Sequence, residues 1–149
     1  MQIDFYILAD NSPRDLYQMI CKLCEKALAQ SMQVLIYTQT SKQAVQLDEL
    51  LWSYKADSFI AHHYVQTDNE TCTSEFDYPV TICAYDDEHD NFDFHAQLLI
   101  NLAENPVTFF EKFERIAEMV DKDSLNKEAG RYRYRFYQEK GYTPNKYDL

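Results

Sequence analysis

The side chains best suited to bind a charged ligand are gathered near the C-terminal end of the chain. Residues 123–142 read D-S-L-N-K-E-A-G-R-Y-R-Y-R-F-Y-Q-E-K-G-Y. If this stretch is helical, its spacing brings four side chains to one face: Arg131, Tyr134, Arg135 and Gln138. Each guanidinium offers a planar fork that fits a carboxylate, and the tyrosine ring offers a flat wall beside it. The face is therefore a candidate carboxylate receptor, and the alternative is an ordinary solvated basic face.

The same stretch carries the end signals of one terminal helix. Asp123 and Ser124 are suited to the N-cap, and Gly141 is suited to the position just beyond the C-cap. We therefore predict a helix over about residues 123–140. The helical repeat predicts that its buried side consists of Leu125, Ala129, Tyr132 and Phe136.

Charge separates this terminal stretch from the rest of the chain. The 149 residues carry a formal charge of −11, which argues against a general nucleic-acid binder because phosphate contacts need a basic surface. Residues 126–149 nevertheless contain six Lys or Arg against three Asp or Glu, whereas residues 1–125 contain eight basic and 22 acidic side chains. A basic patch on an acidic body favours a small acidic partner that binds in one place.

Residues that could bind a metal or carry out redox chemistry are present but poorly spaced. The four cysteines are too few for a disulfide scaffold in a chain of this length, and the C-K-L-C at 21–24 has no second pair. The pair His62-His63 is isolated, and the acidic segment 86–95 has neither calcium-loop nor HExxH spacing. We therefore predict no metal and no cofactor. Both cysteines of C-K-L-C are interpreted as packing residues, and 86–95 as a solvated loop.

The remaining hydrophobic patterns alternate between strands and helices. Apolar runs predict strands at residues 3–8, 33–38, 80–84, 97–102 and 116–120. Ser12 and Ser41 are the predicted N-caps of two helices, with Pro13 at the first helical position of the earlier one, and Pro106 is predicted to open a third, short helix. Residues 66–78 have no apolar period and are predicted to be a loop. The alternation predicts a single α/β domain over residues 1–149, with a mostly parallel layered sheet flanked by helices in a Rossmann-like topology.

The sequence lacks the signals of a nucleotide site. Its two glycines are Gly130 and Gly141, and the first strand–helix turn at 9–13 reads A-D-N-S-P without any glycine. We therefore expect a non-catalytic protein. The alternative is a small α/β enzyme or nucleotide-binding protein that uses the strand ends near Asp10 and Thr38. The N-terminal M-Q-I-D-F-Y-I-L has neither a basic region nor a long apolar run, so we expect a cytoplasmic protein without a membrane span.

Several segments, taken in their order and spacing, carry a family pattern. They are F-Y-I-L at 5–8, L-D-E-L-L-W at 47–52, D-S-F-I-A-H at 57–62, L-L-I-N-L at 98–102, D-S-L at 123–125 and R-x-x-Y-R-x-Y-x-x-x-G-Y from Arg131 to Tyr142. Together they resemble the chi subunit family of bacterial DNA polymerase III, part of the clamp-loader assembly. The resemblance covers most of the chain and is weakest over 66–95.

The resemblance implies an α/β fold without nucleotide binding or catalysis, and two surfaces for protein partners. One surface would bind the C-terminal tail of the single-stranded-DNA-binding protein, which is acidic and ends in an apolar residue with a free carboxylate. The matching positions are Arg131 and Arg135 as forks, Tyr134 as a wall and Val120 in the apolar pocket.

The second surface would bind the psi subunit through Trp52 and Phe59, so that DNA is reached only indirectly. An aromatic pair beside a helix end would also be a suitable interface anchor without the resemblance. The alternative is that both residues belong to an ordinary core.

The sequence departs from the family pattern at one place that bears on the tail site. It carries one extra residue between Leu125 and Arg131, and Gly130 falls inside the predicted helix. Glycine is a weak helix former and could mark a kink that re-aims the arginines. In that case other basic side chains, such as Arg133 or Lys140, would hold the carboxylate.

Overall fold

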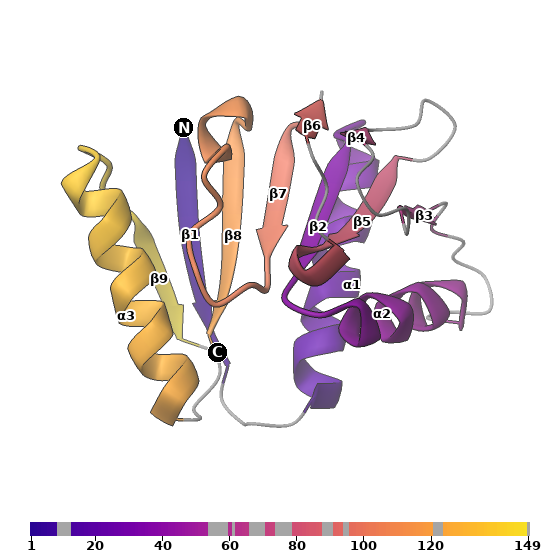
Figure 1. Cartoon of the computed structure of the whole chain (residues 1–149), viewed down its shortest axis with the longest axis horizontal. Coiled ribbons are helices and arrows are strands. Elements are labelled where there is room, and N and C mark those ends of the chain that lie inside the picture. The colour runs from indigo at the N-terminus through magenta and orange to yellow at the C-terminus, as the bar shows by residue number, and fades with distance from the viewer. Residues whose placement is uncertain are drawn as a thin grey trace.

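The computed structural model describes residues 1–8, 13–53, 60, 62–65, 71–73, 79–87, 91–93, 96–120 and 124–148. At its centre lies a sheet built from β1 (Gln2–Ile7), β2 (Val34–Thr38), β3 (His62–Tyr64), β5 (Val80–Ala84), β7 (Leu98–Asn101), β8 (Arg115–Val120) and β9 (Asn145–Asp148). The seven strands lie in the order β3-β5-β2-β7-β8-β1-β9, and every neighbouring pair is parallel (Figure 1). The predicted α/β fold with a parallel sheet is confirmed.

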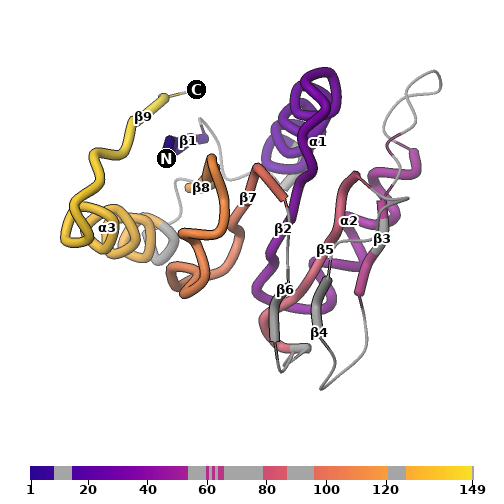
Figure 2. Tube along the Cα trace, turned by 90° about the horizontal axis from the view of Figure 1, so that it is seen from above, coloured from indigo at the N-terminus to yellow at the C-terminus, as the bar shows by residue number. Residues whose placement is uncertain are grey.

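Helices cover both faces of this sheet. Figure 2 shows α1 (Pro13–Ala29) and α2 (Ser41–Ser53) on one face and α3 (Ser124–Glu139) on the other. The side chains of β2 alternate between the two layers: Val34 and Ile36 pack with α1 and α2, whereas Leu35 and Tyr37 pack on the α3 side. All five residues of β2 are buried because a parallel strand covered on both faces meets no solvent, which explains its continuous apolar run.

The first two helices bury the residues that their periodicity indicates. In α2, Ala44, Leu47 and Leu51 have no exposed surface. Cys21 and Cys24 in α1 are free and fully buried, and burial raises the pKa of the Cys21 thiol to about 11. A thiol that stays protonated in this way is a poor metal ligand or nucleophile, and both cysteines pack in the core as predicted.

The short elements were predicted less well. The two predicted loops contain β4 (Thr71–Thr73) and β6 (Asn91–Asp93), which pair in parallel as a separate small sheet, and the turn η1 (Tyr85–Asp87). The helix predicted from Pro106 is only the single 3₁₀ turn η2 (Phe110–Lys112). Elements of three residues are too short to display a hydrophobic period, so the sequence pattern could not reveal them.

The predicted cap of α2 was wrong by one residue. The N-cap is Thr40, whose Oγ1 accepts a hydrogen bond from the backbone N–H of Gln43 at 3.1 Å. Ser41 is instead the first helical residue, and its N–H donates to the carboxylate of Asp86 at 2.7 Å. The N-cap proposed for α1, Ser12, lies outside the described residues.

None of the helices in the described part of the chain has the length and apolar character of a membrane span.

A candidate ligand pocket beside the C-terminal helix

The last helix is positioned by a unit in which β8, α3 and β9 follow one another along the chain. At the end of α3, Gly141 has φ +92°, a left-handed backbone angle that glycine adopts without steric cost. The N–H of Tyr142 donates to the carbonyl oxygen of Tyr137 at 3.0 Å and closes this turn. The chain then returns to the sheet as β9, an edge strand that pairs with β1 (Figure 1). No pattern in the amino-acid sequence predicted β9.

Gly130 allows α3 to lie close to β8. A Cβ atom at this position would come within 2.9 Å of Cγ2 of Val120, which is closer than Cβ atoms approach other atoms in proteins, and within 3.0 Å of Cγ1. The helix is continuous from Ser124 to Glu139, so Gly130 does not interrupt it. Close packing against Val120 is therefore a reason for glycine at this position.

A buried ion pair sets the rotation of α3 about its axis. Nε of Arg133 donates to Oε2 of Glu118 on β8 at 2.7 Å, and the two residues are 4% and 0% exposed. The hydroxyl of Tyr137 donates to the other carboxylate oxygen at 2.7 Å, and Nδ2 of Asn101 donates to it at 3.0 Å. Arg133 also donates to two backbone carbonyl oxygens, those of Glu104 and Met119. The carboxylate and the guanidinium are thus both well supplied with partners, as buried charges require.

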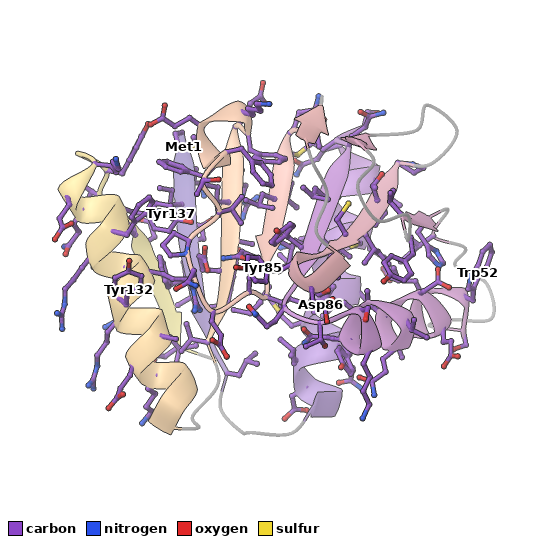
Figure 3. The ribbon with its side chains drawn as sticks, viewed as in Figure 1. Met1, Trp52, Tyr85, Asp86, Tyr132 and Tyr137 are labelled. Carbon is purple, nitrogen blue, oxygen red and sulfur yellow. The ribbon has the colours of Figure 1, made fainter. Side chains whose placement is uncertain are left out.

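The predicted buried side of α3 was wrong, because the helix turns Arg133 and Tyr137 toward Glu118. The residues that are buried are Gly130, Arg133 and Tyr137, whereas Tyr132 is 56% exposed (Figure 3). The side chain of Leu125 lies outside the described set, and Ala129 and Phe136 are only partly buried. The hydrophobicity pattern failed because it counted an arginine as a surface residue, although a partner carboxylate allows its burial.

The described structure contains a pocket between α3 and the sheet with a volume of about 370 Å³, here called the α3 pocket. The lining residues are Phe5, Ile7, Val120, Lys127, Gly130, Arg131, Tyr134, Arg135, Gln138 and Lys146. The four residues predicted for a tail site all belong to this set. The structure therefore brings Arg131, Tyr134 and Arg135 together with Val120, which comes from the preceding strand.

The α3 pocket combines an apolar floor with a basic rim. Phe5 and Val120 are 2% and 7% exposed, and both belong to the core cluster beneath α3. Arg131 and Arg135 are exposed, so their guanidiniums remain solvated when no ligand is present. The ring of Tyr134 lies edge-on to Phe5 with a centroid separation of 5.2 Å, and its hydroxyl donates to the carbonyl oxygen of Pro144 at 3.2 Å. Tyr134 is therefore held in place as a wall of the pocket.

Two cations that line the α3 pocket, Lys127 and Lys146, were not among the residues predicted for the tail site. Lys127 precedes Arg131 by four residues, just as Arg131 precedes Arg135, so helical spacing alone would have found it. Lys146 lies on β9, and only the pairing of β9 with β1 brings it to the α3 pocket. The alternative carboxylate receptors do not line the pocket. Arg133 is paired with Glu118, and Lys140 lies with its Nζ 5.6 Å from the ring centroid of Phe136.

The residues predicted for the second surface are described only in part. Trp52 lies near the end of α2 and is 54% exposed, so it is not an ordinary core residue. Its ring centroid is 4.6 Å from that of His62, a buried residue. The ring nitrogens Nδ1 and Nε2 of His62 lie 2.7 Å and 2.9 Å from the backbone carbonyl oxygens of Ile60 and Asp48. Phe59 lies outside the described residues.

The strand-end alternative receives no support from Thr38. This residue is fully buried, and its hydroxyl lies 2.9 Å from the carbonyl oxygen of Thr40 and 3.4 Å from that of Cys83. Its hydroxyl therefore serves the turn before α2. Asp10 lies outside the described residues. Within the described part of the chain, no group of three or more His, Cys, Asp or Glu side chains could hold a metal ion.

The fold and the pocket together define a parallel α/β protein that carries a basic, apolar-floored cavity beside its last helix. Comparison with known proteins gives the family. Residues 1–145 match the family model described as "DNA polymerase III chi subunit, HolC". The chain belongs to this family, whose members are accessory rather than catalytic subunits of DNA polymerase III.

Three curated relatives agree with this assignment, and each is named DNA polymerase III subunit chi. The Pseudomonas aeruginosa protein is 33% identical over 141 residues, covering 95% of this chain and 92% of the relative. The Haemophilus influenzae protein is 26% identical over 139 residues, covering 93% and 91%. The Escherichia coli protein is 26% identical over 145 residues, covering 95% and 93%. The resemblance inferred from short sequence segments is thereby confirmed at the level of the family.

Proposed function

We propose that this subunit is a non-catalytic adaptor that links the clamp loader to single-stranded-DNA-binding protein. In this proposal the α3 pocket binds the acidic C-terminal tail of that protein, and a separate surface around Trp52 binds the psi subunit. DNA is reached only through the coating protein. The observation that carries the proposal is the composition of the α3 pocket: its described lining residues include four cations and no Asp or Glu.

The pocket matches the chemistry of such a tail in two ways. A terminal carboxylate can accept forked, charge-assisted hydrogen bonds from Arg131 or Arg135. An apolar last side chain can bury itself against the floor formed by Phe5 and Val120, where apolar area leaves water. The surrounding positive charge favours the approach of further acidic residues, even though the protein as a whole has a charge of −11.

The proposed psi surface rests on the exposure of a large aromatic side chain. Tryptophan is among the residues most often found as interface anchors, and half of Trp52 is open to solvent at the end of α2. Figure 3 shows Trp52 on the opposite side of the molecule from α3. The two proposed partners would therefore bind without obstructing one another.

The test of the tail site is a double-mutant cycle. A peptide with several aspartates and an apolar C-terminal residue is compared with its C-terminally amidated form, using wild type and Arg135→Ala. Hydrogen bonds to charged groups contribute roughly 1.5–3 kcal/mol, so either change alone should weaken binding about ten- to a hundredfold. Arg135→Ala and amidation together should reduce the binding free energy by much less than the sum of their separate effects, because both remove the same interaction. Fluorescence anisotropy at low and physiological salt measures the four affinities.

Lys140→Ala is the matched control, because it removes one positive charge from α3 without touching the α3 pocket. It should bind the peptide nearly as wild type does. Strictly additive losses from Arg135→Ala and amidation would show that the carboxylate is not held by Arg135. Undetectable binding of the free-acid peptide to wild type would reject the tail site altogether.

A further inference from the structure

The wall of the α3 pocket opposite the helix carries a cation of its own. Lys127, Arg131 and Arg135 belong to α3, whereas Lys146 belongs to β9 at the edge of the sheet. In the register of the parallel pair, Lys146 lies beside Phe5, which forms part of the pocket floor. A ligand in the pocket therefore lies between two separate sources of positive charge.

The neighbours of Lys146 fix its direction. Alternate side chains of a strand point to opposite faces of a sheet. On the face away from α3, Nδ2 of Asn145 donates to the buried carboxylate of Asp4 at 3.0 Å. On that same face, the ring of Tyr147 stacks on Tyr6 with a centroid separation of 5.4 Å and an interplanar angle of 21°. These two contacts hold β9 against β1 and direct Lys146 toward the α3 side.

We propose that Lys146 binds a side-chain carboxylate of the bound peptide, upstream of its last residue, while the arginines of α3 bind the terminal carboxylate. The inference rests on the proposed tail-binding function. An ammonium is a compact charge with three donors and suits a single oxygen of an aspartate, whereas a guanidinium fork matches both oxygens of a carboxylate. A chain that crosses the pocket from helix to strand presents two anionic groups, one to each wall.

With this arrangement the α3 pocket recognises two features of its ligand instead of one. The arginines require a free C-terminus, and Lys146 requires an acidic residue at a defined distance before it. A peptide with the same net charge but with its aspartate displaced would satisfy the first criterion and fail the second. The specificity of the site is thus for an acidic C-terminal sequence rather than for negative charge in general.

The experiment measures which carboxylate Lys146 recognises. The probe is the free-acid peptide described above, together with variants in which each aspartate is replaced singly by asparagine. We expect wild type to lose about fivefold to tenfold in affinity for one of these variants. Lys146→Gln should bind the parent peptide more weakly than wild type does, by a similar factor. It should bind that one asparagine variant with the same affinity as it binds the parent peptide. Amidation should weaken binding equally in wild type and in Lys146→Gln.

Lys140→Gln is the matched control, because it removes the same charge from the other flank of α3. It should retain the wild-type response to every asparagine variant. One outcome would overturn this inference and leave the proposed function in place. In it, wild type binds the free-acid peptide more tightly than the amidated one, but each asparagine variant weakens binding to Lys146→Gln by the same factor as binding to wild type. Coupling of Lys146 to the amidated terminus instead would also overturn it. Absence of any binding by wild type would remove the proposed function and this inference with it.

Discussion

Three arginines of α3 at alternate positions show how the environment decides what one residue type does. Arg131 and Arg135 are one helical turn apart, and both lie exposed at the rim of the α3 pocket. Arg133 lies between them in sequence, but two residues correspond to about half a turn, so it points into the protein. There it meets the carboxylate of Glu118 and becomes part of the anchor of the helix. Only the exposed pair remains free to bind a ligand.

Gly130 is the residue whose replacement should change the α3 pocket most directly. Gly130→Ala places a methyl group within 2.9 Å of a methyl group of Val120, so either α3 or the Val120 side chain in the pocket floor must shift. The better helix propensity of alanine contributes about 1 kcal/mol, but overpacking costs about 1–3 kcal/mol. We expect a net loss of about 1 kcal/mol in the free energy of unfolding, measured by urea denaturation, and weaker peptide binding.

The companion variant is Gly130→Ala with Val120→Ala, which removes the two methyl groups that the new side chain would meet. Relative to Val120→Ala alone, adding Gly130→Ala should then be neutral or stabilising. If Gly130→Ala on its own raises the stability, the helix approaches the strand less closely than described and the steric explanation is wrong.

At the scale of elements, α3 is joined to β7 and β8 by a buried polar cluster rather than by apolar packing alone. Burial raises the pKa of Glu118 above that of an ordinary glutamate, although Arg133, Asn101 and Tyr137 oppose the shift by stabilising the charged form. Between the pKa of Glu118 in the unfolded chain and its higher pKa in the folded state, the folded protein therefore holds a proton that the unfolded chain has released. The free energy of unfolding should consequently decrease as the pH rises above about 4.3, the ordinary pKa of a glutamate.

Glu118→Gln isolates this contribution because glutamine has a similar shape and does not titrate. The stability of wild type relative to Glu118→Gln should fall as the pH rises from about 4.3, by at most about 1.4 kcal/mol per pH unit, until Glu118 is ionised in the folded state. Urea denaturation of both proteins over the range from about pH 4 to 8 measures the difference. If the stability of wild type relative to Glu118→Gln instead increases with pH, Arg133 lowers the pKa of Glu118 more than burial raises it. Glu128→Gln, at an exposed position of the same helix, is the control.

At the scale of the whole molecule, the parallel sheet separates the two proposed binding surfaces. α3 and β9 lie at one end of the strand order, and α2 packs against β3 and β5 at the other (Figure 1). The chain reaches from one end to the other because α1 connects β1 to β2 across the intervening β8 and β7. With the sheet between them, the two proposed surfaces would hold two partners at a fixed spacing.

Trp52→Ala tests whether the surfaces are independent. If Trp52 is an anchor, its truncation should weaken binding of the psi subunit by about 2 kcal/mol or more and leave peptide binding at the α3 pocket unchanged. Isothermal titration calorimetry with each partner measures both affinities. Val45→Ala, another exposed apolar residue of α2, should change neither. Equal losses for both partners, with an altered circular dichroism spectrum, would show that Trp52 supports the fold instead.

The sequence by itself determined the features that repeat locally or follow the chain. The strands β2, β5, β7 and β8 were evident as largely apolar runs because most side chains of a strand covered on both faces are apolar. The position of α3 was evident from its end signals, and the cations at 131 and 135 from helical spacing. The family was evident from segments in a fixed order.

Only the tertiary structure decided which side of α3 is buried and what completes the pocket beside it. The pairing of Arg133 with Glu118 and the contact between Gly130 and Val120 join residues from different elements, and helical periodicity contains no information about a partner on another strand. Lys146 reaches the pocket through β9, a short exposed edge strand that backbone pairing with β1 stabilises rather than a hydrophobic pattern. Local patterns follow from the repeat of a single element, whereas a site between elements depends on how the elements pack.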